Sequence, residues 1–268
     1  MPVSPKQPSA NPQVSLLPST DAKRHCRALM KKLDKFGRIN LSSEALQDSR
    51  LSTAPLFGDA RGQMFGILLC KVEKSGRDFK AGQSSPPPEP VILKAFSGQF
   101  NGLWEAPGWA PPLLDAGVFR NAVLHADPPI KKLTAEINNL SRDNPQGGSQ
   151  LLTGLIEKRR LLSQRHMNEI HRMYRIHSFS GEETDLFSLF ADRSGIPAGT
   201  GDCCAPKLLN LAIQLGLQPI SLAEFYWGRE NRSGTKQHGY FYPPCSDKCG
   251  PVLPFMLQGT EFTGAEID

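Results

Sequence analysis

The sequence predicts an α/β domain in which a small sheet is flanked by helices. Two β-rich runs, residues 64–72 and 91–98, stand in the first half of the chain, and a mostly apolar strand follows at residues 219–227. The segments around them carry apolar residues at helical spacing. Strands interspersed with helices are typical of a sheet covered by helical layers, and 268 residues suffice to bury a substantial core.

The composition is that of a globular protein with a mild positive charge. Hydrophobic residues make up 39% of the chain and the net charge is +5. This charge is compatible with a polyanionic partner, and ordinary surface lysine and arginine would give the same surplus. No stretch approaches the ~18 uninterrupted apolar residues of a membrane span, so no membrane partner is expected. The N-terminus lacks a secretion signal, which predicts a cytoplasmic protein with reduced cysteines and leaves organelle targeting open.

Residues 1–60 are expected to form a disordered leader and a short basic helix. Pro, Ser, Gln and Asn dominate the first twenty residues, so little surface can be buried there. A basic amphipathic helix follows at residues 22–36, with Asp21 as its N-terminal cap and Gly37 as its stop.

Residues 61–128 are predicted to hold a β-hairpin and a loop rich in proline and aromatic residues. The two β-rich runs would pair antiparallel across a long polar connection. The loop at residues 104–115 is interpreted as a hydrophobic cover over the sheet, with ligand stacking as the alternative.

Residues 129–192 are predicted to be a basic helical insert. Helices at residues 129–141 and 150–177 would form a hairpin, and a short helix at residues 183–191 would follow. The polar side of the second helix could reach toward RNA phosphates, although a solvated helix face has the same pattern. The basic residues of this arm are Lys158, Arg159, Arg160, Arg165, Arg172 and Arg175.

Residues 193–268 are expected to form the cysteine-bearing helix-strand-helix half of the same domain. A helix would open at Ala205 or Pro206 and stop at Gly216. The apolar strand at residues 219–227 has the character of a buried, parallel strand. Pro244 would then introduce a last helix.

Four of the six cysteines lie in this half, at expected helix starts. On one helix, Cys245 and Cys249 would share a face, and Cys203 or its neighbour Cys204 would add a third thiolate. Helix N-termini favour thiolates, so Zn²⁺ is the predicted cofactor. Three protein ligands leave a zinc position open, as in catalytic sites, whereas His238 as a fourth ligand would close it. Alternatively, these cysteines are reduced, partly buried small hydrophobes.

This arrangement resembles the zinc-dependent nucleobase deaminase fold, which implies a cytidine-deaminase-like sheet. In that family a hairpin precedes a helix opened by His/Cys-Ala-Glu, a Pro-Cys-x-x-Cys motif opens the next helix, and the Glu moves protons. Cys203, Cys245 and Cys249 match the ligands. The second motif here has three intervening residues, and Ala205 stands where the Glu is expected.

A deaminase without that Glu needs another carboxylate as proton carrier. The nearby candidates are Asp202 and Glu224, whose alternative roles are a helix-capping or turn residue and a paired carboxylate, respectively. Further side chains could contact a substrate or serve as a fourth ligand: His238, Cys204, Lys207, Trp227 and Tyr240.

Residues 64–259, about three-quarters of the chain, also resemble the N-terminal extension of some bacterial RluA-type pseudouridine synthases. The matching pieces are residues 64–66, 95–98, 107–112, 201–203, 205–209, 223–228, 238–239, 241–243, 245, 248–249 and 255–259. The His-Arg-Leu-Asp motif that supplies the nucleophilic Asp of those enzymes does not occur here. The chain is therefore not expected to make pseudouridine by that mechanism.

Two functions fit these observations. The first is a zinc-binding, deaminase-like domain associated with RNA modification, which contacts RNA or an RNA-modifying enzyme. The second is an active zinc-dependent deaminase, a hydrolase acting on a nucleobase, nucleoside or related amine, with Asp202 or Glu224 as proton carrier.

Overall fold

The computed structural model describes residues 16–41, 48–72, 89–143 and 150–260. The first fifteen residues of the predicted leader, most of the hairpin connection and the break between the two insert helices lie outside these ranges. Within them, no helix is both long and apolar enough to cross a membrane.

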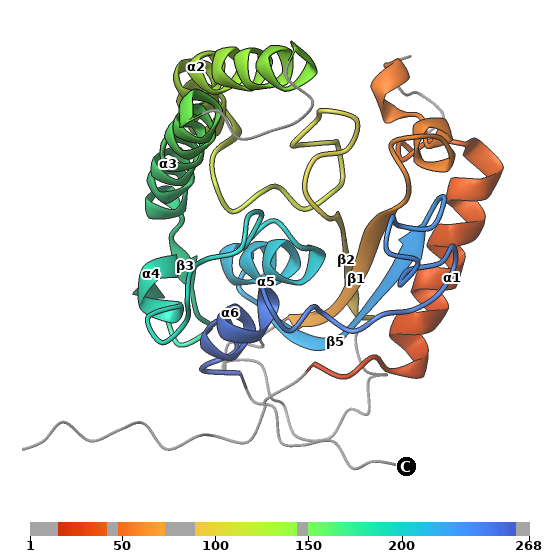
Figure 1. Ribbon diagram of the computed structural model, residues 1–268. Coiled ribbons are helices and arrows are strands. Elements are labelled where there is room, and N and C mark those ends of the chain that lie inside the picture. Colours follow the sequence, from red (N-terminus) through yellow and green to blue (C-terminus); the bar gives the residue numbers. More distant parts are fainter. Residues whose placement is uncertain (1–15, 42–47, 73–88, 144–149, 261–268) are drawn as a thin grey trace, which may run out of the picture.

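The centre of the fold is a three-stranded sheet in the order β2-β1-β5 (Figure 1). Strand β1 (Gln63–Val72) lies between β2 (Val91–Phe96) and β5 (Leu217–Trp227) and runs antiparallel to both. The α/β class and the antiparallel hairpin are thus confirmed.

Strand β5 is buried along most of its length, as predicted, but the expectation of a parallel strand is wrong. Helices cover both faces of the sheet: α5 (Cys204–Gln214) packs on one face and α1 (Thr20–Phe36) on the other (Figure 1). Burial on both faces produces the continuous apolar run that parallel sheets usually show, whatever the strand direction.

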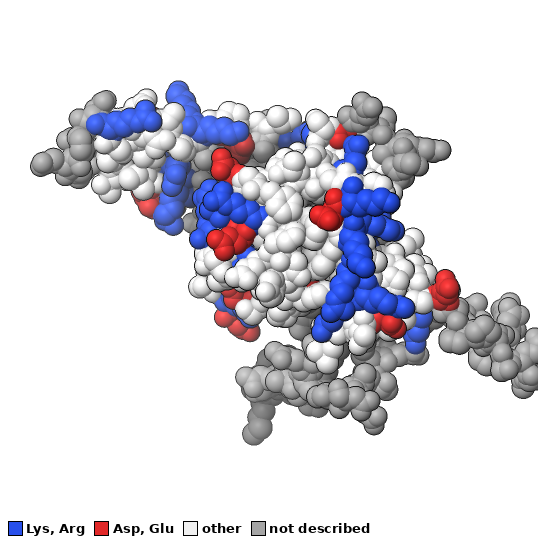
Figure 2. All heavy atoms as spheres, turned by 90° about the vertical axis from the view of Figure 1, so that its right-hand side faces the viewer, with Lys and Arg blue, Asp and Glu red and all other residues white. Residues whose placement is uncertain are grey.

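Helix α1 confirms the predicted basic helix and corrects its start. The N-cap is Ser19, whose side chain accepts a hydrogen bond from the Ala22 amide, and not Asp21. Gly37 ends the helix with φ 59°, a conformation that glycine adopts readily. The end of the predicted leader is packed on the protein, because Leu16 is buried and the Ser19 amide donates to the Ser221 hydroxyl. Figure 2 shows the exposed side of α1 as a stripe of Lys and Arg side chains.

The segment after α1 contains two 3-10 helices, η1 (Ser49–Leu51) and η2 (Ala54–Phe57), where the sequence has no clear period. The later proline- and aromatic-rich loop covers the sheet as predicted. Its Trp109 is buried against Phe65 and donates its indole N–H to the carbonyl of Ile39 at 3.1 Å.

The helical insert differs from the prediction at its ends. Helix α2 (Ala116–Asp143) begins well before residue 129, because the Asp115 carboxylate caps it by accepting the amides of residues 117 and 118. Helix α3 (Gln150–Met173) stops before residue 177. The chain then forms the strands β3 (Ile176–His177) and β4 (Glu183–Thr184).

The predicted helix at residues 183–191 shrinks to α4 (Leu186–Leu189), since residues 183–184 pair as a strand and the Asp185 side chain caps the helix. The last helix, α6 (Cys249–Met256), starts later than Pro244. Residues 246–248 form a turn instead, and the Cys249 amide donates to the Cys245 carbonyl.

Candidate metal centre

Three cysteine side chains converge beside the sheet, as the sequence predicted. Cys203 is the N-cap residue of α5, Cys249 is the first residue of α6, and Cys245 lies at the turn that leads into α6. The Sγ atom of Cys245 is 4.0 Å from that of Cys203 and 3.7 Å from that of Cys249. All three Sγ atoms lie within 4.8 Å of one another.

This spacing fits a metal ion better than it fits a disulfide or separate thiols. A tetrahedral ion with metal–sulfur bonds of about 2.3 Å places its ligand sulfurs about 3.8 Å apart. A disulfide brings two sulfurs to about 2.05 Å, and all three cysteines are free thiols. The trio therefore could hold a metal ion.

The three thiols share their protons unequally. Hydrogen bonding with Cys203 and Cys249 lowers the pKa of Cys245, while hydrogen bonding with Cys245 raises the pKa of Cys203 to about 12. The pKa of Cys249 is also raised, through its hydrogen bonds to the other two and through burial. The lowered pKa of Cys245 favours its thiolate, which is the form that binds metal.

The position of Cys203 is fixed by the loop in front of α5. The Tyr174 hydroxyl donates to the Asp202 carboxylate at 2.7 Å, and the Gly98 amide donates to the Asp202 carbonyl at 2.7 Å. Gly201 adopts φ 92°, and a Cβ there would meet the Tyr174 ring at 2.7 Å. This loop therefore requires glycine at residue 201 for both its backbone angle and its packing.

A second glycine lets α5 approach the sheet closely. Gly66 on β1 faces the first turn of α5, and a Cβ there would lie 2.8 Å from the Cys204 Cβ. Cys204 itself points toward the strands, with its thiol donating to the carbonyls of Met64 and Ala95. It is therefore a core residue outside the three-cysteine cluster, and its role as a ligand stays a prediction.

The position of Glu224 bears directly on its predicted role as a proton carrier. Its side chain is buried on β5 and accepts a hydrogen bond from the Ala205 amide at 2.9 Å. Burial raises the pKa of Glu224 to about 7. The Ala205 hydrogen bond and the charge of Lys236 oppose the rise, and the Cys245 charge adds to it. The Glu224 carboxyl group thus lies beside Ala205, the residue that stands where the deaminase motif has its Glu.

Asp202, the other candidate, is engaged by the Tyr174 hydroxyl, and desolvation raises its pKa. Tyr174 lies just beyond the end of α3. Nothing in the local pattern could show that its hydroxyl reaches a loop 28 residues away.

The remaining predicted contact residues have structural partners of their own. The Lys207 ammonium is buried and donates to the carbonyls of Phe96 and Gly98, which ties α5 to the end of β2. His238 lies outside the cysteine cluster. Its Nδ1 accepts the Gly228 amide, and its ring packs on Trp227 with centroids 4.2 Å apart.

Trp227 is buried and Tyr240 is exposed, with its carbonyl bound to the Tyr226 amide. On the predicted RNA arm, Arg160 pairs with Glu157 and Arg175 pairs with Glu183. RNA contact by this arm stays a prediction.

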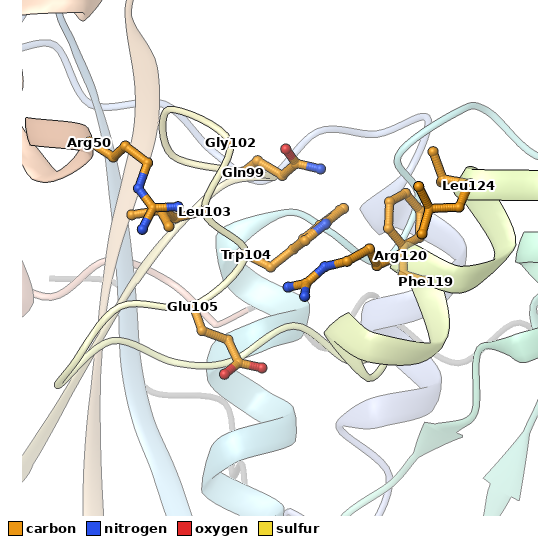
Figure 3. A pocket seen from close by; sticks show the side chains of 10 residues that line it. Arg50, Gln99, Gly102, Leu103, Trp104, Glu105, Phe119, Arg120 and Leu124 are labelled. Carbon is orange, nitrogen blue, oxygen red and sulfur yellow. The ribbon is translucent and has the colours of Figure 1, made fainter. Parts of the chain in front are cut away.

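A separate cleft of about 350 Å³ opens between the loop after β2 and the start of α2 (Figure 3). Trp104, Phe119 and Arg120 line it, and Arg50 reaches its edge. None of the three clustered cysteines lines this cleft, and the Arg50 guanidinium is held by Asp48 at 2.7 Å.

Comparison with known proteins adds no relative. No family model, no curated protein and no solved structure matches this chain.

Proposed function

We propose that the protein is a zinc-binding, deaminase-like domain that serves as a binding module associated with RNA modification. One observation carries the metal site: three thiols from separate segments meet at the spacing of a tetrahedral ion's ligands. Within the described residues, the cluster contains no carboxylate or imidazole. An all-thiol donor set favours zinc over magnesium or calcium. The association with RNA is supported by the resemblance to the synthase extension and by the basic charge.

A specific observation favours a second function, a zinc-dependent hydrolase that deaminates a nucleobase, nucleoside or related amine. The buried Glu224 carboxyl supplies a proton-carrying group beside the cysteines. It could replace the Glu of the deaminase motif, which is Ala205 in this chain. A carboxyl whose pKa is near the working pH can both take and return a proton. A zinc ion there would act as a Lewis acid. Glu224 is better suited than Asp202, whose carboxylate already accepts the Tyr174 hydroxyl.

Metal analysis tests the shared part of both functions. The purified chain should carry one zinc per molecule, and Cys203→Ser or Cys245→Ser should lose it. Cys204→Ser is the matched control, because its thiol faces the strands, and it should keep the metal. Full zinc content in the Cys203 and Cys245 variants would overturn the site.

Two further measurements separate the module from the enzyme. RNA binding that weakens as salt rises, without ammonia release from cytosine or adenine compounds, supports the module. Ammonia release that Glu224→Gln abolishes and Asp202→Asn preserves supports the hydrolase. If the wild-type chain neither binds RNA nor releases ammonia, both assignments fail and only the metal site stands.

A further inference from the structure

Helix α1 concentrates the positive charge of the chain on one surface. It carries six Lys or Arg residues and two Asp residues, a net charge of +4, whereas the whole chain carries +5. The cations are Lys23, Arg24, Arg27, Lys31, Lys32 and Lys35. All except the half-buried Lys23 are exposed. The rest of the protein is therefore nearly neutral, and α1 is its basic element.

These cations form a line along the helix. Arg24, Arg27, Lys31 and Lys35 follow one another at spacings of three and four residues, which places them on one side. At a rise of 1.5 Å per residue they span about 17 Å. Figure 2 shows the resulting stripe of Lys and Arg side chains.

The stripe is poorly neutralised by the protein itself. Arg24 pairs with Asp21 at 3.1 Å, and both side chains are more than two-thirds exposed, so the pair contributes little. Among the described residues, no carboxylate lies within ion-pair distance of Arg27, Lys31, Lys32 or Lys35. Such a surface attracts a partner with closely spaced negative charges.

The opposite side of α1 argues against a lipid membrane as that partner. Its apolar residues Ala22, Cys26, Leu29 and Leu33 are buried in the core beneath the sheet. A helix that binds at a bilayer surface inserts an apolar face between the lipids. That face of α1 is already used for folding, and only its cations remain for binding.

The stripe also reaches the segment that leads to the candidate metal centre. The Arg27 guanidinium lies 5.6 Å from the centre of the Phe241 ring. Phe241 pairs with Phe225 on the outer side of β5 and stands four residues before Cys245. A nucleic-acid strand bound along α1 would therefore run past Phe241, in the segment that leads to Cys245.

We propose that the exposed face of α1, rather than the insert arm, binds the phosphate backbone of RNA. The choice of RNA rests on the proposed function, and the surface itself rests on the charge of α1. The insert arm is the weaker surface, because α3 has five Lys or Arg residues and two Glu residues, a net charge of +3 against +4 for α1. Among the described residues, two of the six arm cations pair with carboxylates (Arg160 and Arg175), against one of the six on α1 (Arg24).

Fluorescence anisotropy with a labelled single-stranded RNA tests this proposal. The variant Lys31→Gln/Lys32→Gln/Lys35→Gln removes three charges from α1, and Lys158→Gln/Arg160→Gln/Arg165→Gln removes three from the arm. Losing three phosphate contacts should lower the slope of log affinity against log salt by about 2 and weaken binding about fiftyfold at about 0.15 M salt. The arm variant should bind nearly as well as wild type. Exchanging the same three α1 lysines for arginine should also preserve binding, which guards against a folding artefact.

Each outcome of these binding measurements either supports or refutes the proposed α1 surface. An α1 variant that binds like wild type while the arm variant loses affinity would refute the α1 surface and leave the RNA assignment standing. A wild-type chain without salt-sensitive RNA binding would overturn the RNA assignment and this inference together, with the zinc measurement unaffected. Wild-type binding to phosphatidylserine vesicles that needs the α1 lysines, without RNA binding, would make the surface a membrane contact and refute the proposal.

Discussion

Glu224→Gln tests whether the carboxyl beside the cysteines is protonated in the folded protein. Burial raises the pKa of Glu224 from 4.5 to about 7. The folded state thus holds the proton more tightly than the unfolded chain. The contribution of Glu224 to the free energy of unfolding is therefore greatest below pH 4.5, and it is lost as the pH rises through 7. The full loss corresponds to about 3 kcal/mol of unfolding free energy.

Glutamine is uncharged between pH 4.5 and pH 8, so the Glu224→Gln variant should not lose this unfolding free energy as the pH rises. Urea unfolding at pH 4.5 and pH 8 should show that wild type loses about 3 kcal/mol more than Glu224→Gln between the two conditions. The comparison must be a difference between two proteins, because other groups titrate in the same window. Burial lowers the pKa of His171, for example, which works in the opposite direction and is common to both.

Two controls sharpen the assay. Glu230→Gln changes an exposed glutamate in the loop that follows β5 and should parallel wild type across the pH range. Repeating the series with EDTA removes any contribution from protons released by metal-bound thiols. Parallel curves for wild type and Glu224→Gln would refute the reasoning. They would mean that the positive charge of Lys236, which lowers the pKa of Glu224, keeps the buried carboxylate ionised.

Three further changes probe how the site is built. Gly66→Ala should cost about 1–3 kcal/mol by overpacking α5 against β1 and should weaken zinc binding, as measured by urea unfolding and chelator competition; wild-type values for both would show that α5 shifts freely. Tyr174→Phe should cost about 1–3 kcal/mol, because it leaves the Asp202 carboxylate without its hydroxyl donor, and an unchanged melting curve would count against that bond. Cys204→Ala should lower stability but keep stoichiometric metal, whereas Cys203→Ala should lose it; metal loss in both would mean that Cys204 is a ligand.

The sequence alone determined the helices and strands that depend on the pattern of neighbouring residues. The two β-rich runs, the amphipathic basic helix ending at Gly37, and the helix after Cys203 all lie within two residues of the predicted bounds. Helix ends were less predictable where a side chain competes for the cap. Ser19 and Asp115 cap their helices at positions that periodicity alone does not reveal.

The sequence by itself also indicated which cysteines could act together, because Cys203 or Cys204, Cys245 and Cys249 stand at or near predicted helix starts. Their meeting within 4.8 Å was decided only by the tertiary structure, since packing of α5 and α6 brings together sulfurs more than forty residues apart. The same holds for Glu224. Its place beside Ala205 depends on the register of β5 under α5, a long-range contact that leaves no signal in the residues around either position.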